Sequence, residues 1–386
     1  MDTLSTREVL SLSFSLIYFD FLSIMKIIFV LLTVSFVSLG ILVLWQQSFQ
    51  VVPQMLPSPT SPVLERESLI PQTMTPPLVT APSHYIQSMS HMYQKMNNCG
   101  PASATMAAST LSVDFDQFHA AATLKGGPND KNVSAPEITA FLENEGLNAI
   151  YRLNGTPEII EALVASDIPV IVEQWLLKPA NGELDGHYRV VRGYDRERKV
   201  FTTNDAFNGA DFEISYAQFD SWWRPFLRGY IVVYKLEQTQ TVQTILGQQW
   251  DAHTNKLLAL DHFILETETI GDGYSYFNLG TTATQLEQYE TAKTAYDLAL
   301  TSTFPTNCLW YQFEPLRAYL ELGEYDRVLE MTDRLLRSAG EMEEARAYRG
   351  LVFMRQGRKS EARVEFEKAL QANPRYALAQ ESLESL

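Results

Sequence analysis

The chain has 386 residues, which is too long for one ordinary domain and indicates two or three. Its hydrophobic fraction of 46% is sufficient to build buried cores. The net charge of -16 argues against nucleic acid and against an anionic membrane surface as partners, because like charges repel.

Residues 27–45 form an unbroken, uncharged and apolar run. At 1.5 Å per residue this run spans roughly 28 Å as a helix, about the thickness of a bilayer core. Lys26 precedes it, and the next basic residue is Arg66. The positive-inside bias therefore predicts a single membrane helix with the bulk of the chain on the extracytoplasmic side. Since no small-residue cleavage pattern closes the run, we interpret it as a signal anchor.

The segments on either side of this run have different characters. Residues 1–26 form the predicted cytoplasmic N-terminus, and Met25-Lys26 resembles a natural start, which makes residues 1–24 a candidate mis-assigned extension. Residues 46–83 are rich in proline, with serine and threonine between the prolines. This composition favours extended conformations that bury little surface, so we interpret the segment as a spacer.

Residues 84–236 form the first predicted folded domain. Helical patterns come first, at residues 101–111, 115–124, 135–144 and 157–163, and strand patterns follow at residues 169–173, 187–193, 200–203 and 230–234. Helices followed by strands predict an α+β domain.

Cys99 is predicted to lie at the start of a helix. Asn98 suits the N-cap, Pro101 suits the first turn, and a run of small residues follows. The positive end of the helix dipole stabilises a thiolate, which is the nucleophilic form of cysteine. Gln94, five residues upstream, could direct its amide at an oxyanion beside Cys99. The alternative is a buried cysteine that only packs.

The later strands supply the partners that a cysteine nucleophile needs. His187 follows the predicted turn at residues 182–186 and is expected to open its strand. Its imidazole can take the Cys99 proton and later protonate a leaving amine. A two-strand meander brings Asp205, at the end of the next strand, close to His187, where a carboxylate would orient the ring. The alternatives are a polar edge histidine and an ordinary Asn-Asp turn.

These motifs resemble those of the C39-like cysteine peptidases, a papain-like group that includes bacteriocin-processing peptidases. The matching pieces are Gln94, residues 97–102, residues 187–195 and residues 204–205. The resemblance implies a papain-like fold with Cys99 as nucleophile, His187 as general base and acid, Asp205 as orienting residue and Gln94 in the oxyanion hole.

The chain departs from this family in two respects. The family often has Asp-Pro where this chain has Asp205-Ala206. The peptidase domains of peptide exporters face the cytosol, whereas the predicted topology faces outward.

Other polar and aromatic residues of this domain are given structural interpretations. We assign His91 to a loop, His119 to a surface or packed position, and Trp222 and Trp223 mainly to the core. No His/Cys cluster has zinc-ligand spacing and no glycine-rich phosphate loop is present, so we expect neither a metal nor a cofactor.

Residues 237–386 show a helical repeat with a period near 34. Aligning the turns starts units near residues 273, 309 and 343, with alanine, glycine and aromatic residues at fixed offsets. The pattern resembles tetratricopeptide repeats, which implies antiparallel helix pairs stacked as a solenoid. Residues 242–268 are expected to add one or two helices, and Cys308 falls in a loop between repeats.

Together these features predict a membrane-anchored cysteine peptidase, a thiol hydrolase of peptide bonds, whose repeats dock a peptide substrate or a protein partner. One alternative is an inactive papain-like scaffold that binds partners through its repeats. Another is an amidase or acyltransferase on the same fold, because the same thioester chemistry serves hydrolysis and transfer.

Overall fold

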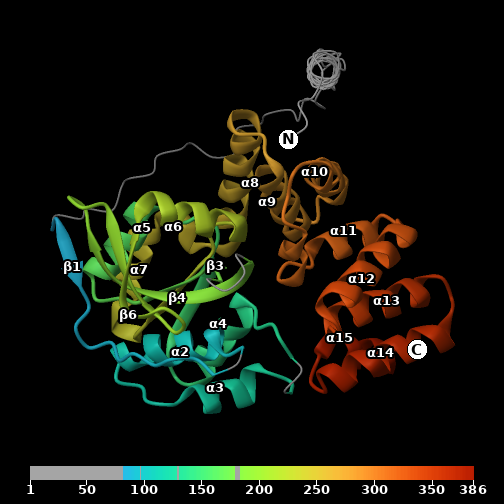
Figure 1. Ribbon diagram of the computed structural model, residues 1–386, viewed down its shortest axis with the longest axis horizontal. Coiled ribbons are helices and arrows are strands. Elements are labelled where there is room, and N and C mark those ends of the chain that lie inside the picture. The colour runs from blue at the N-terminus through green and yellow to red at the C-terminus, as the bar shows by residue number, and fades with distance from the viewer. Residues whose placement is uncertain (1–80, 96, 128–129, 179–182) are drawn as a thin grey trace, which may run out of the picture. The chain divides into compact units, whose positions relative to one another are not determined.

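The computed structural model describes residues 81–95, 97–127, 130–178 and 183–386, all within one compact unit (Figure 1). The predicted membrane segment and nearly all of the proline-rich spacer lie outside these residues. Within the described part of the chain, no helix combines the length and the apolar character that a membrane crossing requires. The membrane anchor therefore stays a prediction.

An antiparallel sheet lies at the centre of the first domain (Figure 1). Its strands run in the order β2-β7-β3-β4-β5-β6, and β1 pairs with β4. The strands are β1 (Ser83–Tyr85), β2 (Asn148–Arg152), β3 (Val170–Leu177), β4 (Leu184–Asp195), β5 (Val200–Asp205), β6 (Gly209–Ser215) and β7 (Tyr230–Tyr234).

Helices cover both faces of this sheet. One side carries α2 (Cys99–Thr110), α3 (Gln117–Leu124) and α4 (Ala135–Asn144), and the other carries α5 (Pro157–Ala165), α6 (Tyr216–Trp223) and α7 (Thr239–Leu246). Alternate side chains of each strand point to opposite faces. Ile171 accordingly packs with the first set, whereas Val170 and Val172 pack with the second. This three-layer arrangement agrees with the predicted α+β class.

The position of His187 within its strand differs from the prediction. His187 was expected to open the strand, but β4 already begins at Leu184, which pairs with Leu177 of β3. His187 pairs with Gln174 inside the ladder. The predicted turn at residues 182–186 is wrong in its second half, because β3 extends far enough to hold residues 184–186 in the sheet.

The second part of the chain is helical (Figure 1). After α8 (Ala252–Thr269) come three helix pairs and a last helix: α9 (Gly273–Gln285) with α10 (Tyr289–Thr301), α11 (Glu314–Glu321) with α12 (Tyr325–Ala339), α13 (Glu343–Arg355) with α14 (Lys359–Ala372), and α15 (Ala377–Glu384). We call α8–α15 the repeat array. Short 3-10 segments η1 (Arg224–Phe226), η2 (Leu236–Gln238), η3 (Gly247–Trp250) and η4 (Thr306–Trp310) connect the elements.

Glycines allow the paired helices of the array to approach closely. A Cβ at Gly280 would lie 2.7 Å from the ring of Tyr296, and a Cβ at Gly350 would lie 2.5 Å from the ring of Phe366. Both aromatic residues are fully buried. The two pairs occupy equivalent positions in the first and third repeat, which explains the small residues at fixed offsets.

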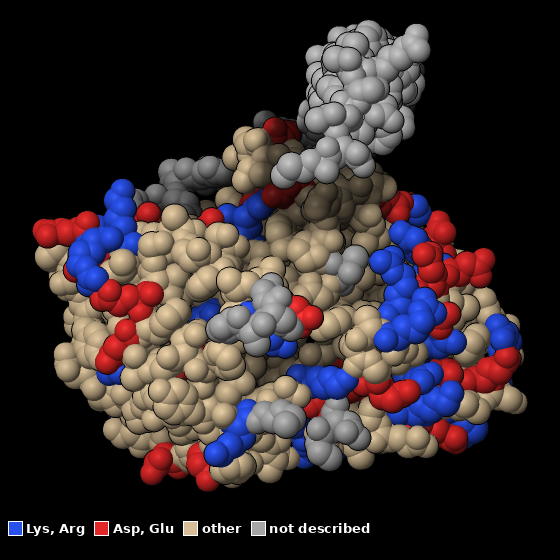
Figure 2. All heavy atoms as spheres, viewed as in Figure 1, with Lys and Arg blue, Asp and Glu red and all other residues tan. Residues whose placement is uncertain are grey.

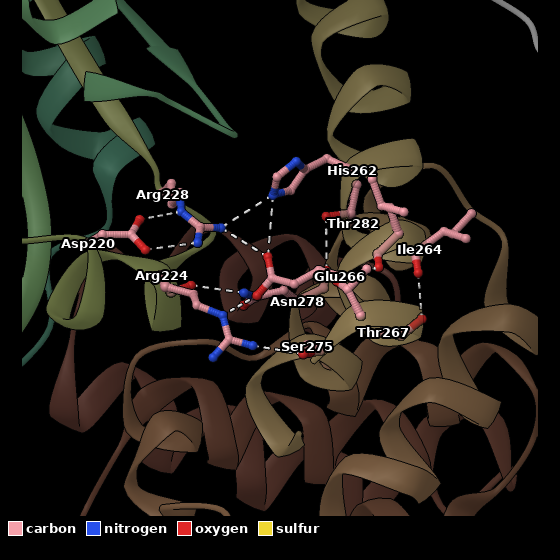
Figure 3. A network of polar contacts seen from close by, with 12 residues as sticks. Asp220, Arg224, Arg228, His262, Ile264, Glu266, Thr267, Ser275, Asn278 and Thr282 are labelled. Atoms are coloured by element: carbon pink, nitrogen blue, oxygen red, sulfur yellow. Dashed lines mark hydrogen bonds and ion pairs between the residues drawn. The ribbon is translucent and has the colours of Figure 1, made fainter. Parts of the chain in front are cut away.

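Two junctions join the array to the sheet domain. At the first (Figure 3), Arg224 and Arg228 of the sheet domain bind Glu266 of α8, and Arg224 also donates to Asp272 at 2.6 and 2.9 Å. Asn278 of α9 donates to the Arg224 carbonyl at 2.8 Å. This network fixes the start of the array beside η1.

The second junction lies at the other end of the array. Arg375 donates to the carbonyls of Ala122 and Thr123 at the end of α3, at 2.9 and 3.1 Å. Between the two junctions, in the middle of the array, Asn132 donates to the Trp310 carbonyl of η4 at 2.7 Å. The array is therefore bonded to the sheet domain at both ends and at its middle.

Candidate active site

Cys99 is the first residue of α2. The preceding turn places Asn97 in the left-handed region at φ 56° and Asn98 at the N-cap. The Asn98 side chain makes no capping bond and instead donates to Gln117 at 3.4 Å. Gln117 also accepts from the backbone N–H of Lys95 at 2.7 Å, so it holds the loop that leads to Cys99.

The thiol of Cys99 and the imidazole of His187 lie close enough to shift each other's pKa. Burial raises the pKa of Cys99, but the hydrogen bond and charge of His187, with backbone N–H groups, lower it below its ordinary value overall. Burial lowers the pKa of His187, but hydrogen bonds to Asp205 and Cys99 raise it overall. The lowered pKa of Cys99 and the raised pKa of His187 both favour a thiolate beside an imidazolium.

Asp205 lies at the end of β5 and binds the far side of the same ring. Its Oδ1 is 2.8 Å from His187 Nε2, and both side chains are almost completely buried. Burial raises the pKa of Asp205, but His187 and Arg189 lower it far below its ordinary range. The carboxyl group is therefore charged, and it holds the imidazole whose pKa Cys99 helps to raise.

The sequence analysis assigned no role to Arg189, which the structure places beside the His187–Asp205 pair. Its Nε donates to Asp205 Oδ2 at 2.7 Å, and its Nη1 donates to Gln174 at 3.1 Å. The side chain is fully buried, and its guanidinium lies over the ring of Trp222 at 5.2 Å. The sequence feature that could have identified it is its position. Arg189 lies two residues after His187 and therefore on the same face of the strand.

The loop that carries Gln94 runs beside these residues. Its backbone N–H donates to the carbonyl of Ala206, the residue after Asp205, at 2.9 Å. His91 of the same loop contacts the Asp205 carbonyl at 3.0 Å, a contact that its assignment to a loop did not anticipate. The Gln94 side chain is half-buried, and its Oε1 has no hydrogen-bond partner among the described residues.

The remaining predicted residues lie away from this constellation. Trp223 is buried in the core and donates to the Gly229 carbonyl at 2.7 Å. Cys308 lies in η4 and is fully buried, and burial raises its pKa well above the ordinary value. His119 contacts Glu145 at 2.7 Å on the surface. No group of three or more possible metal ligands occurs among the residues that the structure describes.

A cavity of about 500 Å³ lies between the sheet domain and the array. Tyr188, which follows His187, and Glu173 of β3 line one wall, and residues 311–314 line the other. Burial is the main cause of the raised pKa values of Glu173 and Tyr188, and the charge of Cys99 contributes to both. Two lining side chains therefore lie within electrostatic range of the sulfur.

Comparison with known proteins gives a family for each part of the chain. The Peptidase_C39 like family matches residues 84–230, and tetratricopeptide repeat families match residues 273–303 and 343–376. No curated protein matches the chain.

Three solved peptidase structures match part of the chain. A protein described as a C39-like peptidase from Bacillus anthracis is 14% identical, with a TM-score of 0.34, covering 40% of this chain and 98% of that one. A double glycine motif protease from an AMS/PCAT transporter, solved with a leader peptide, is 17% identical, with a TM-score of 0.30 and coverages of 39% and 94%. The peptidase domain of Streptococcus ComA, an ABC transporter, is 16% identical, with a TM-score of 0.30 and coverages of 39% and 99%. From the family matches, the chain carries a C39-like peptidase domain followed by tetratricopeptide repeats.

Proposed function

We propose that the chain is a membrane-anchored cysteine peptidase in which Cys99 is the nucleophile, His187 the general base and acid, and Asp205 the orienting residue. The observation that carries the proposal is the buried His187–Asp205 pair, together with the opposite pKa shifts that Cys99 and His187 cause in each other. A cysteine that only packs has no need of this pair.

The contacts support the following reaction. The Cys99 thiolate adds to the carbonyl carbon of a peptide bond, and the C–N bond then breaks as the His187 imidazolium gives its proton to the leaving amine. Water next gives a proton to the neutral imidazole and attacks the thioester. The tetrahedral intermediate then collapses, the acid product leaves, and the sulfur departs as a thiolate beside the imidazolium, which restores the ion pair.

The oxyanion of each tetrahedral intermediate needs hydrogen-bond donors. Because Cys99 is the first residue of α2, its backbone N–H has no partner within the helix. We assign this N–H and the side-chain amide of Gln94 to the oxyanion hole. In other enzymes, loss of one such donor costs about 10²- to 10³-fold in kcat.

The other parts of the chain have supporting roles in the proposal. Residues 27–45 anchor the protein in the membrane with its folded domains on the extracytoplasmic side. The repeat array docks a peptide substrate or a protein partner beside the cleavage site, consistent with the cavity that the two domains share.

The proposal is tested by cleavage of a mixed peptide library, read by mass spectrometry. The full chain should cleave peptide bonds, whereas Cys99→Ser and His187→Ala should lose cleavage and retain their folds. Asp205→Asn should lose less, because the residue orients the ring without touching the substrate. Equal cleavage by the wild type and Cys99→Ser would contradict the proposal, and transfer to an added amine would indicate an acyltransferase instead.

A further inference from the structure

The cavity between the two domains is lined by groups that accept hydrogen bonds. Its carboxyl groups belong to Glu137, Glu173, Glu314 and Glu344, and its tyrosines are Tyr151, Tyr188, Tyr311, Tyr348 and Tyr376. The sheet domain supplies Glu137 and Glu173, and the array supplies Glu314 and Glu344, so both walls of the cavity contribute carboxyl groups.

The cationic side chain at the cavity is already engaged. Arg317 is the arginine of the lining, and its guanidinium donates to Glu287 at 3.3 Å and to Tyr289 at 3.1 Å. Neither partner lines the cavity. Its charge also lowers the pKa of Glu314, but this one arginine stands against four lining carboxyl groups.

Two lining side chains have acceptor oxygens that the protein leaves unused. Gln312 is 7% exposed, and its Nε2 donates to the Pro225 carbonyl at 2.9 Å, whereas its Oε1 has no partner among the described residues. Glu344 Oε2 is also buried without a partner in the described part of the chain. A buried acceptor without a donor is costly, so both oxygens point to a ligand that brings donors.

The carboxyl groups show the same deficit of positive charge. Burial raises the pKa values of Glu314 and Glu344, and burial with the charge of Cys99 raises the pKa of Glu173 to about 8. A bound cation would reverse these shifts. On the face of the array that Figure 2 shows, by contrast, acidic and basic side chains are interspersed. Exposed pairs of the array such as Arg358 with Glu361 neutralise each other.

We propose that this cavity binds a positively charged nitrogen of the peptide substrate, an ammonium or guanidinium group, between its carboxylates and tyrosine rings. Several tyrosine faces and carboxylates around one opening suit a cation that has been partly stripped of water. Two sources supply this chemistry: the side chain of lysine or arginine, and the α-amino group at the peptide N-terminus. Cleavage of the bound peptide rests on the proposed function. Binding of the cation does not depend on it.

The test measures binding without catalysis, on the full-length Cys99→Ala protein. A peptide library that differs at one position at a time, with lysine, arginine, norleucine or glutamate, is equilibrated with the immobilised protein and the bound fraction is read by mass spectrometry. Each peptide is supplied with a free and with an acetylated N-terminus. We expect about tenfold enrichment of cationic over norleucine peptides, a factor typical of one good cation contact.

The different peptides distinguish a side-chain cation from an α-amino group, and they separate the cation-site inference from the peptidase proposal. Enrichment by lysine in acetylated peptides assigns the side chain, whereas enrichment that requires the free N-terminus assigns the α-amino group. Equal binding of norleucine or glutamate peptides, or no binding at all, overturns the inference. Selective binding together with no cleavage by the wild type refutes the peptidase proposal and leaves the cation site standing.

Substitutions locate the binding on the molecule. Glu314→Gln combined with Glu344→Gln should reduce the enrichment to near one. Glu367→Gln, the same change at an exposed position of α14 outside the cavity, should leave it unchanged. If the double variant still enriches cationic over norleucine peptides as strongly as the parent protein does, the cavity is not the site that binds them.

Discussion

Arg189 and Asp205 form a fully buried ion pair between β4 and β5, with Nε 2.7 Å from Oδ2. The two residues are directly opposite in the strand register. His187 holds the other carboxylate oxygen, so one aspartate joins the candidate catalytic ring to a buried arginine. The electrostatics of the site therefore depend on a residue that contacts neither the sulfur nor a substrate.

Arg189→Met should destabilise the protein by about 3 kcal/mol, because it leaves part of the charge of Asp205 buried without its partner. Since Arg189 lowers the pKa of His187, its removal should also move the alkaline limb of activity to higher pH. Urea unfolding and a pH–rate profile measure the two effects. Arg198→Met, at an exposed ion pair with Glu213, is the control and should change the stability far less than Arg189→Met does. An unchanged profile would restrict Arg189 to a structural role.

The first junction should weaken in acid. Burial raises the pKa of Glu266, but His262, Arg228 and Arg224 lower it to about 2 in the folded protein (Figure 3). A depressed pKa contributes stability that is fully present above the unfolded value near 4.5 and is lost as pH falls through the folded value. The contribution of Glu266 is of the order of 3 kcal/mol.

Unfolding free energies measured from pH 6 to pH 2 test this assignment. Glu266→Gln should be less stable than the wild type at pH 6, and its stability should fall less steeply below pH 4.5. Parallel curves for the two proteins would show that Glu266 does not supply the acid sensitivity.

Gly186, next to His187, is expected to couple the sheet domain to the array. A Cβ at this position would lie 2.8 Å from the ring of Tyr311 in the array. Gly186→Ala should therefore cost about 1–3 kcal/mol through overpacking. Tyr311→Ala removes the obstacle, so the double variant should lose less than the sum of the two single losses.

Thermal unfolding of the four proteins in this cycle gives the coupling energy. Gly127→Ala is a matched control, because its added Cβ would have only an ordinary contact at 3.6 Å. Strict additivity of Gly186→Ala and Tyr311→Ala would mean that the ring and the glycine do not constrain each other in solution.

Gly350→Ala should destabilise the array although alanine favours helices by about 1 kcal/mol over glycine. The added Cβ overlaps the ring of Phe366, which is fully buried and has little room to move, and the overlap should cost about 1–3 kcal/mol. Adding Phe366→Leu should recover part of the loss. Stabilisation by Gly350→Ala alone, seen as a higher Tm, would contradict this packing.

The features that could be predicted from the sequence depend on local patterns. The helix that begins at Cys99 follows from its turn and its small residues, and the repeats follow from a fixed spacing. The approach of Asp205 to His187 follows from a short connection between two strands.

The features that were missed depend on contacts between distant segments. The early start of β4 is set by the length of β3, and the role of Arg189 requires the register that places it opposite Asp205. The cavity forms where residues far apart in the sequence meet, as in the bond from Asn132 to Trp310. No local pattern carries that information.

The central claim, that Cys99 is a thiolate held by His187, is tested most directly by its alkylation with iodoacetamide at pH 6. Cys308 is an internal control, because it is buried and burial raises its pKa well above the ordinary value. We predict rapid and selective labelling of Cys99 in the wild type, and a rate at least about tenfold lower in His187→Ala, whose thiol lacks the imidazolium. Equal labelling of both cysteines, or a Cys99 rate that His187→Ala leaves unchanged, would contradict the account.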